Sequence, residues 1–295
     1  MIKKVRNAPL LVVGVGGGSA SGKTLLLKSI SRFLGDGNIA HLDLDGYHLH
    51  TRQERKKLRE YPEDIKANDF DKIVNDILSL ISGKAIDMPI YDHRKGIFLP
   101  PKRLIPKPIV VVEGLHAIKI NEIAQKKILD LSIFLYPEED LRKSWKVRRD
   151  VDERNYLYSE VKEEISLREP LVAKYILPQI DIADIVIRME RARNHHIVYR
   201  VLLSPAFYNR CFAEKNIKKS VLKFFSKRKV NFENKHYVEI HPKINDTLLD
   251  FLKDRMYQLG LIIPKLTAAN VKHHEPFSEI TPFLSVLIIS MVSQR

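Results

Sequence analysis

The chain has 295 residues, of which 44% are hydrophobic and 29% are charged, and it carries a formal net charge of +14. This composition is typical of a globular protein with room for one α/β domain and an appendage. The single cysteine, Cys211, excludes an internal disulfide and a zinc site built from cysteines, and it suits a reducing compartment, so we expect a cytoplasmic protein.

The positive charge is compatible with nucleic acid, an anionic membrane or an anionic small molecule as partner. Basic residues are dispersed apart from short clusters such as Lys218-Lys219 and Lys227-Arg228-Lys229, and no long basic arm or aromatic–basic series occurs. We therefore expect a solvated basic surface and an anionic small-molecule substrate, without a nucleic-acid or membrane partner.

The pattern of apolar residues between positions 10 and 187 predicts strands that alternate with helices. An apolar run at residues 10–15 enters a glycine-rich loop instead of a small-residue cleavage site, which favours a buried strand over a signal peptide. Apolar residues at helical spacing predict helices at 23–34 and 71–82, the second capped by Asp69 and ended by Gly83. Short apolar runs predict the other strands at 39–44, 109–113, 131–135 and 185–187. This alternation predicts an α/β fold whose mostly parallel or mixed central sheet is covered by helices on both faces.

The character of the sequence changes after Arg193. Two predicted strands, at 197–203 and 237–240, flank a lysine-rich stretch, and a predicted helix follows at 247–258. The apolar run at 283–292 is too short to span a bilayer and favours a core or interface strand. We therefore predict an α/β core at residues 1–193 and a C-terminal α+β extension at residues 194–295 that packs on the core sheet or forms an interface.

The glycine-rich loop matches the phosphate-binding pattern G-x-x-x-x-G-K-[ST] without a mismatch, between a predicted strand and a predicted helix. Its glycines let backbone N–H groups turn toward phosphate oxygens, and the helix N-terminus adds favourable partial charge. We expect Lys23 to reach the terminal phosphates and the Thr24 hydroxyl to bind Mg²⁺. The alternative is a glycine-rich turn without a ligand. The residues expected to hold ATP are Gly17, Gly18, Ser19, Ala20, Ser21, Gly22, Lys23 and Thr24.

Acidic residues follow two other predicted strands. Glu113 ends the run IVVV and could hold Mg²⁺ or a water bound to it. Asp45 ends the strand HLDLD, with Asp43 deeper inside, and a carboxylate there could accept the proton of a substrate hydroxyl. His48 and Arg52 follow, and cations beside a base favour an acceptor that is itself anionic. A solvated polar loop is the alternative for these residues.

Several segments, in order, resemble the phosphoribulokinase/uridine kinase family. The segment DGYH, Asp45 to His48, with Arg52 after it, resembles an element that ends in His in the phosphoribulokinase branch and in Tyr in uridine kinases. The resemblance covers residues 11–188 and implies a P-loop NTPase fold of the nucleoside-kinase type with three layers. Further similar segments are PIYDH (89–93), EGLHA (113–117), WKVRRDVDERNY (145–156) and SLREPLVAKYILPQIDIADIVI (166–187).

The resemblance implies roles for individual residues. Asp45 resembles the catalytic base, Lys23 and Thr24 the ligands of ATP phosphates and Mg²⁺, and Glu113 the second acidic metal-site residue. Lys146 and Arg149, three apart and so on one face of a helix, resemble the pair that stabilises charge on the transferring phosphoryl group. The residues that resemble the sugar-phosphate pocket are His48, Arg52, Tyr91, His93, Arg154 and Arg168; ordinary surface cations are the alternative.

The sequence departs from the family pattern at three positions. Many members have a second Asp where this chain has Gly46, so here Asp45 lacks the adjacent acid of those members. Ser21 stands where the redox-regulated branch has a cysteine, and no second thiol exists for an internal switch. Lys23 is present although the bacterial branch lacks the loop lysine, so the acceptor of this chain could differ.

The leading hypothesis is an ATP- and Mg²⁺-dependent kinase that converts ribulose 5-phosphate to ribulose 1,5-bisphosphate, as a homo-oligomer. The alternatives are a uridine/cytidine kinase or a kinase of another phosphorylated sugar. A nucleotide-binding regulatory or nucleic-acid-binding protein with an idle kinase site is an alternative of a different class.

Overall fold

The computed structural model describes residues 11–193, 196–213, 224–242, 245–263 and 276–292. The chain divides into two compact units, the first comprising residues 1–23 and 40–182 and the second residues 24–39 and 183–295. Each is described by itself below. The division into a core at 1–193 and an extension at 194–295 stays a prediction.

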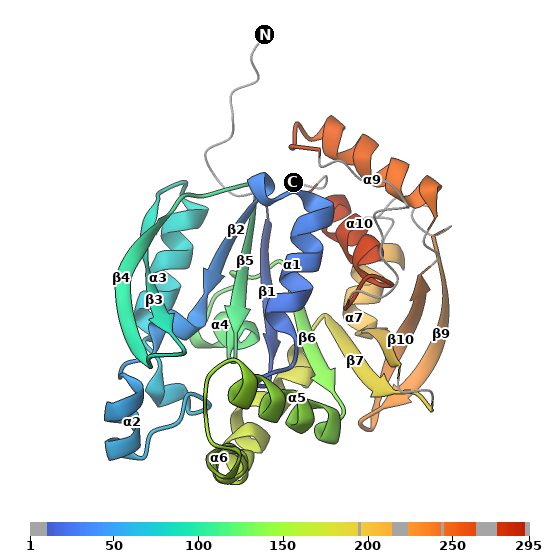
Figure 1. Cartoon of the computed structure of the whole chain (residues 1–295). Coiled ribbons are helices and arrows are strands. Elements are labelled where there is room, and N and C mark those ends of the chain that lie inside the picture. Colours follow the sequence, from blue (N-terminus) through green and yellow to red (C-terminus); the bar gives the residue numbers. More distant parts are fainter. Residues whose placement is uncertain (1–10, 194–195, 214–223, 243–244, 264–275, 293–295) are drawn as a thin grey trace. The chain divides into compact units, whose positions relative to one another are not determined.

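The first unit contains strands in the order β2-β5-β1-β6 (Figure 1). β1 (Leu11–Gly17) pairs in parallel with β5 (Ile109–Gly114) on one side and with β6 (Leu131–Pro137) on the other, and β2 (Ile39–Asp43) follows β5. All residues of β1 and β5 are buried, which is why both read as continuous apolar runs. The predicted start of the first strand, Leu10, lies outside the described residues.

The helix α3 (Phe70–Ile81) closes one side of this unit's hydrophobic core. Ile73, Ile77 and Leu80 are buried in one cluster with apolar side chains of β1, β2 and β5. The Asp69 side chain accepts a hydrogen bond from the backbone N–H of Lys72 at 2.9 Å, so the predicted cap is confirmed.

The first unit also contains elements that carry site residues. After β2, a 3₁₀ turn over Leu44–Tyr47 leads to α2 (Arg52–Leu58), which begins with a capping box between Thr51 and Glu54. β3 (Ile86–Asp92) and β4 (Ile97–Leu104) form an antiparallel hairpin. The remaining helices are α4 (Ile120–Ile123), α5 (Glu139–Asp152) and α6 (Tyr158–Leu171), followed by a π-helical turn over Val172–Ile176 and a 3₁₀ turn over Leu177–Ile182.

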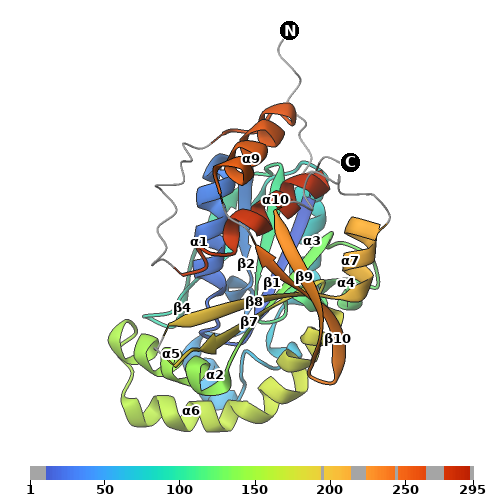
Figure 2. The same cartoon turned by 90° about the vertical axis from the view of Figure 1, so that its right-hand side faces the viewer.

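The second unit contains antiparallel strands in the order β7-β8-β10-β9, and Figure 2 shows its β9–β10 hairpin. The buried Glu239 of β10 holds this sheet across strands, with Arg200 Nε at 2.8 Å and Arg228 Nε at 2.6 Å. Its described strands are β7 (Ile185–Arg191), β8 (Ile197–Leu203), β9 (Phe225–Phe232) and β10 (Lys235–Pro242). Its described helices are α1 (Lys23–Leu34), whose first residue belongs to the first unit, α7 (Pro205–Tyr208), α9 (Asp246–Gln258) and α10 (Thr281–Val292). Together with the parallel strands of the first unit they make the mixed α/β architecture that the sequence predicts.

The expectation of a strand at 283–292 is wrong, because these residues belong to helix α10. Every residue of α10 except Met291 is buried, so the helix has no polar face that would give a helical period. An apolar run without periodicity does not distinguish a buried helix from a buried strand. Within the described part of the chain, none of the helices has the length and apolar character that crossing a bilayer requires.

Candidate active site

The phosphate loop follows β1 and turns back on itself. Gly17 has a φ of +145°, and a Cβ there would lie 2.7 Å from Ser21 Oγ and 2.8 Å from the Leu135 carbonyl oxygen, so the position requires glycine. The Lys23 ammonium donates to the carbonyl oxygens of Gly17 and Gly18, each at 3.1 Å. Ser21 Oγ is fully buried without a hydrogen-bond partner among the described residues. A loop with a folded-back lysine and an unsatisfied hydroxyl fits a bound phosphate chain.

Asp45 lies in the turn directly after β2, with a histidine near each carboxylate oxygen. His93 Nε2 is 3.0 Å from Oδ2, and His48 Nε2 is 4.0 Å from Oδ1. The Asp45 backbone N–H donates to Asp43 Oδ1 at 3.0 Å. Burial works to raise the pKa of Asp45, but the hydrogen bond and charge of His93, with the charge of Lys23, hold it below its ordinary value. Asp45 is therefore ionised at neutral pH, as a proton acceptor must be.

Two further carboxylates lie near Asp45. Burial, together with the charges of Asp45 and Glu113, raises the pKa of Asp43 to about 6. Glu113 is buried in β5, and its Oε2 is 3.0 Å from His41 Nε2. His41 was not among the sequence-predicted residues; its only signal is its alternation with Asp43 along β2.

The electrostatics connect these acids with the loop. Burial is the largest effect on Lys23 and lowers its pKa, while the charges of Glu113, Asp45 and Asp43 raise it and that of Arg149 lowers it. Each of these groups therefore acts on the loop ammonium. Asp45 and Glu113, which the sequence predicts as base and metal-site residue, therefore both interact electrostatically with Lys23.

Cations of α5 and of the turn after it gather around one carboxylate, Asp150. Lys146 Nζ lies 2.5 Å, Arg149 Nη2 2.8 Å and Arg154 Nη1 3.4 Å from its oxygens. Arg149 Nη2 also donates to Ser19 Oγ of the loop at 3.1 Å. Burial opposes ionisation of Asp150, but Lys146 and the two arginines hold its pKa below the ordinary value. Asp150 lies within the segment WKVRRDVDERNY, but no pattern in the sequence indicates that three cations surround it.

Arg52 and Tyr91 support the turn that carries His93. The Arg52 guanidinium donates to the carbonyl oxygens of His93 and Arg94, and its Cζ lies 4.7 Å from the centre of the Tyr156 ring. The Tyr91 ring packs edge-on against the His48 and His93 rings, at centroid distances of 5.6 and 5.2 Å.

The Tyr91 hydroxyl accepts a hydrogen bond from Arg55 Nη2 at 2.9 Å. Tyr91 thus packs between the two histidines through its ring and is fixed at its other end by α2. Direct contact of Tyr91 and Arg52 with substrate stays a prediction.

The last predicted pocket cation, Arg168 of α6, lies among different neighbours. It pairs with Glu164 at 3.0 Å and with the buried Glu63 at 3.7 Å, and its Cζ lies 5.6 Å from the Tyr61 ring centre. Burial opposes its charge, but Glu63 and Glu164 hold the pKa of Arg168 above its ordinary value. Its place in a sugar-phosphate pocket therefore stays a prediction.

A divalent cation would have few protein ligands here. Among the residues that the structure describes, no group of three or more His, Cys, Asp or Glu side chains could hold a metal ion. Mg²⁺ commonly takes one or two protein oxygens and completes its shell with phosphate and water, which Glu113 and the Thr24 hydroxyl would suit. Thr24 is the second residue of α1 and is exposed. Its part in a metal site stays a prediction.

Comparison with known proteins gives related sequences and a similar fold. The chain is 34% identical over 180 residues to a phosphoribulokinase of Synechocystis sp., a match that covers 61% of this chain and 54% of that protein. It is 31% identical over 183 residues to a uridine kinase of Chloroflexus aurantiacus, covering 60% of this chain and 85% of that one. The chain thus spans about half the length of the first curated relatives it matches.

A solved structure extends the likeness of fold to nearly the whole chain. It is described as phosphoribulokinase from Rhodobacter spheroides, covers 98% of each chain, and has a TM-score of 0.61 at 16% sequence identity. The model of the Phosphoribulokinase / Uridine kinase family matches residues 12–195. That match includes the loop, Asp45 after β2, Glu113 in β5 and the cations of α5, and the chain therefore belongs to the phosphoribulokinase/uridine kinase family.

Proposed function

We propose that this protein is an ATP- and Mg²⁺-dependent kinase that phosphorylates ribulose 5-phosphate to ribulose 1,5-bisphosphate. The observation that carries the proposal is the setting of Asp45. Its carboxylate is ionised, lies beside His93 and His48, and acts electrostatically on the loop lysine Lys23. A base held next to the phosphate loop is what transfer to a hydroxyl requires.

Each residue of the candidate site has a role in the proposed phosphoryl transfer. When bound, ATP supplies the phosphoryl group and Mg²⁺ neutralises part of its charge. Lys23 and the loop N–H groups hold the phosphate chain, and Thr24 and Glu113 would hold the cation. Asp45 accepts the proton of the attacking hydroxyl. Lys146 and Arg149 stabilise the negative charge of the transition state, and Asp150 orients both.

The surplus of cations near Asp45 favours an acceptor that already carries a phosphate. His93 pairs with Asp45, and Arg52 donates to the backbone carbonyl oxygen of His93. Arg154 pairs with Asp150, and the charge of Asp45 works to raise the pKa of Arg154. A neutral nucleoside does not need these charges. A relative named uridine kinase matches with 85% of its length, however, so uridine and cytidine are the acceptors to compare.

A coupled ADP-release assay over pentose phosphates, hexose phosphates, uridine and cytidine tests the proposal, with identification of the phosphorylated product by mass spectrometry. We expect turnover with ribulose 5-phosphate. Turnover of uridine without any of ribulose 5-phosphate would refute it. A homo-oligomer in the cytoplasm stays the expected state of the protein, and light scattering on the purified chain tests the assembly.

A further inference from the structure

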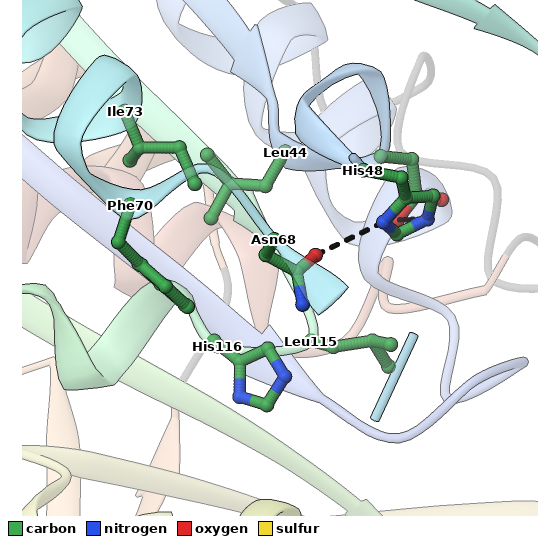
Figure 3. A pocket seen from close by; sticks show the side chains of 8 residues that line it. Leu44, His48, Asn68, Phe70, Ile73, Leu115 and His116 are labelled. Atoms are coloured by element: carbon green, nitrogen blue, oxygen red, sulfur yellow. Dashed lines mark hydrogen bonds and ion pairs between the residues drawn. The ribbon is translucent and has the colours of Figure 1, made fainter. Parts of the chain in front are cut away.

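The inference concerns a small cavity beside Asp45, with a volume of about 10 Å³ (Figure 3). This volume holds about one water molecule or one hydroxyl group. Its apolar lining comes from the turn after β2, from α3 and from Leu115, and its polar lining consists of four side chains: Asp45, His48, Asn68 and His116.

The orientation of the Asn68 amide is fixed by backbone carbonyl groups. Its Nδ2 donates to the carbonyl oxygens of Pro62 at 3.1 Å and of Asp64 at 2.9 Å. Because a flipped amide would direct Oδ1 at two carbonyl oxygens, the nitrogen must occupy this position. Both amide protons are committed, and Asn68 Oδ1 faces His48 Nδ1 at 2.9 Å, as Figure 3 shows.

This geometry sets the tautomer of His48. Asn68 Oδ1 only accepts hydrogen bonds, so His48 Nδ1 must carry the proton. Burial lowers the pKa of His48, with Arg55 and His93 acting in the same direction and Asp45 and the Asn68 hydrogen bond against it, so the ring is neutral at neutral pH. His48 Nε2 then carries a lone pair. It lies 4.0 Å from Asp45 Oδ1, too far for a hydrogen bond between them.

His116 repeats the pattern at the other side of the cavity. Its Nε2 lies 3.2 Å from the Pro62 carbonyl oxygen, which places the proton on Nε2. Burial lowers the pKa of His116 to about 4, so this ring is also neutral. Its Nδ1 is a buried acceptor without a hydrogen-bond partner among the described residues. The polar side chains around the cavity therefore offer lone pairs and no free proton.

We propose that this cavity is a subsite for a second hydroxyl group of the acceptor, and that Asn68 is the positioning residue that fixes His48 Nε2 as its hydrogen-bond acceptor. A site lined by acceptors attracts an O–H donor and repels a phosphate oxygen. Asp45 would take the proton of the reacting hydroxyl while His48 binds a neighbouring one. His48 thus binds a sugar hydroxyl within the sugar-phosphate pocket that the resemblance implies for it. The identity of the acceptor rests on the proposed function.

The tautomer is tested on the unliganded full chain, independently of activity. Two-bond ¹H–¹⁵N correlation spectra of histidine-labelled protein report which ring nitrogen carries the proton, and the His48 signals are assigned by their loss in His48→Phe. We expect the proton on Nδ1. Asn68→Ala should shift it toward Nε2, whereas Asn121→Ala should not. Asn121 is a matched control, because its side chain also fixes backbone, at Ile128 and Leu129, without contacting His48. A proton on Nε2 in the parent, or no shift in Asn68→Ala, overturns the assignment.

The subsite is tested with ribulose 5-phosphate and its 3-deoxy and 4-deoxy analogues. We expect one analogue to have a KM raised by about tenfold in the parent, the cost of a lost hydrogen bond. In His48→Phe, which retains a planar ring beside Tyr91, that analogue and ribulose 5-phosphate should have equal KM values. If neither analogue has a raised KM in the parent, or if the increase persists in His48→Phe, the subsite is refuted. Absence of turnover with every sugar phosphate refutes the proposed function and the hydroxyl contact, while the spectra still decide the tautomer.

Discussion

Arg149 of α5 donates a hydrogen bond to Ser19 Oγ of the phosphate loop over 3.1 Å, across 130 residues of sequence. The same guanidinium is held by Asp150 at 2.8 Å. A cation that touches the loop and is oriented from behind by a carboxylate is prearranged for a phosphate chain, because no reorganisation is needed when charge develops.

Arg149→Ala should therefore lower kcat by about 10²–10³-fold while ATP binding changes much less, since the charge acts mainly in the transition state. The neighbouring Arg148 is the control. It lies on the solvent side of α5, with its side chain 84% exposed, and pairs with Asp152 at 3.7 Å. Steady-state kinetics and nucleotide titration on both variants check this, and equal losses in the two would contradict the assignment.

Asp45→Asn should abolish most turnover, by about 10²–10⁴-fold, because an amide cannot accept the proton of the attacking hydroxyl. The variant keeps the shape of the side chain and leaves the Asp43–Asp45 backbone hydrogen bond in place. Nucleotide affinity, measured by calorimetry, should stay close to that of the parent. Near-normal turnover would remove Asp45 as the base.

The candidate-site residues that the sequence indicates are those whose chemistry follows from a local pattern, and their roles stay predictions. Lys23 follows from an eight-residue motif between a strand and a helix, and Asp45 and Glu113 follow from their places after strands. Asn68 and Asp150 act through partners that only the fold brings near, and no spacing rule indicates them. Their side chains matter because of orientation: Asn68 by its fixed amide, Asp150 by the cations around it.

The fold was predictable to a similar extent. The strands β1, β5 and β6 are buried almost throughout and appear in the sequence as apolar runs. The β3–β4 hairpin was not predicted, because β4 is mostly exposed and Pro89, Pro100 and Pro101 interrupt the strand pattern. β9 was not predicted either, because it lies in a lysine-rich segment without an apolar strand pattern. It is an edge strand, and exposed basic side chains on an edge strand prevent it from pairing with other chains.

Arg52→Ala should raise the KM for the sugar phosphate, and also lower kcat, because Arg52 holds the turn that carries His93. Loss of that support loosens the hydrogen bond from His93 to Asp45. Lys56→Ala is the control, since Lys56 is an exposed cation of the same helix. If Arg52→Ala and Lys56→Ala have the same Michaelis constant for the sugar phosphate as the parent, Arg52 is not part of the pocket.

Asp43 should make the folded protein less stable as the pH rises. Its pKa is about 6 in the folded chain against an ordinary 3.8, so the folded state binds the proton more tightly and stability falls between about pH 4 and pH 6. Asp43→Asn removes this cost and can still accept from the Asp45 N–H. Urea unfolding should show the variant more stable than the parent by roughly 1–3 kcal/mol at about pH 8, and equal to it near pH 4. A difference that does not vary with pH would argue against a raised pKa.

The turn after β2 leaves no room for a side chain at Gly46. A Cβ at this position would lie 2.1 Å from the Pro89 carbonyl oxygen and 2.7 Å from its carbonyl carbon, so the turn after β2 admits no side chain against the β3 backbone. Gly46→Ala should cost about 1–3 kcal/mol of stability and displace Asp45 from the His93 side chain, with a matching loss of turnover. Thermal unfolding and steady-state kinetics check this, and a Gly46→Ala protein as stable and as active as the parent would show that the β3 backbone can move aside.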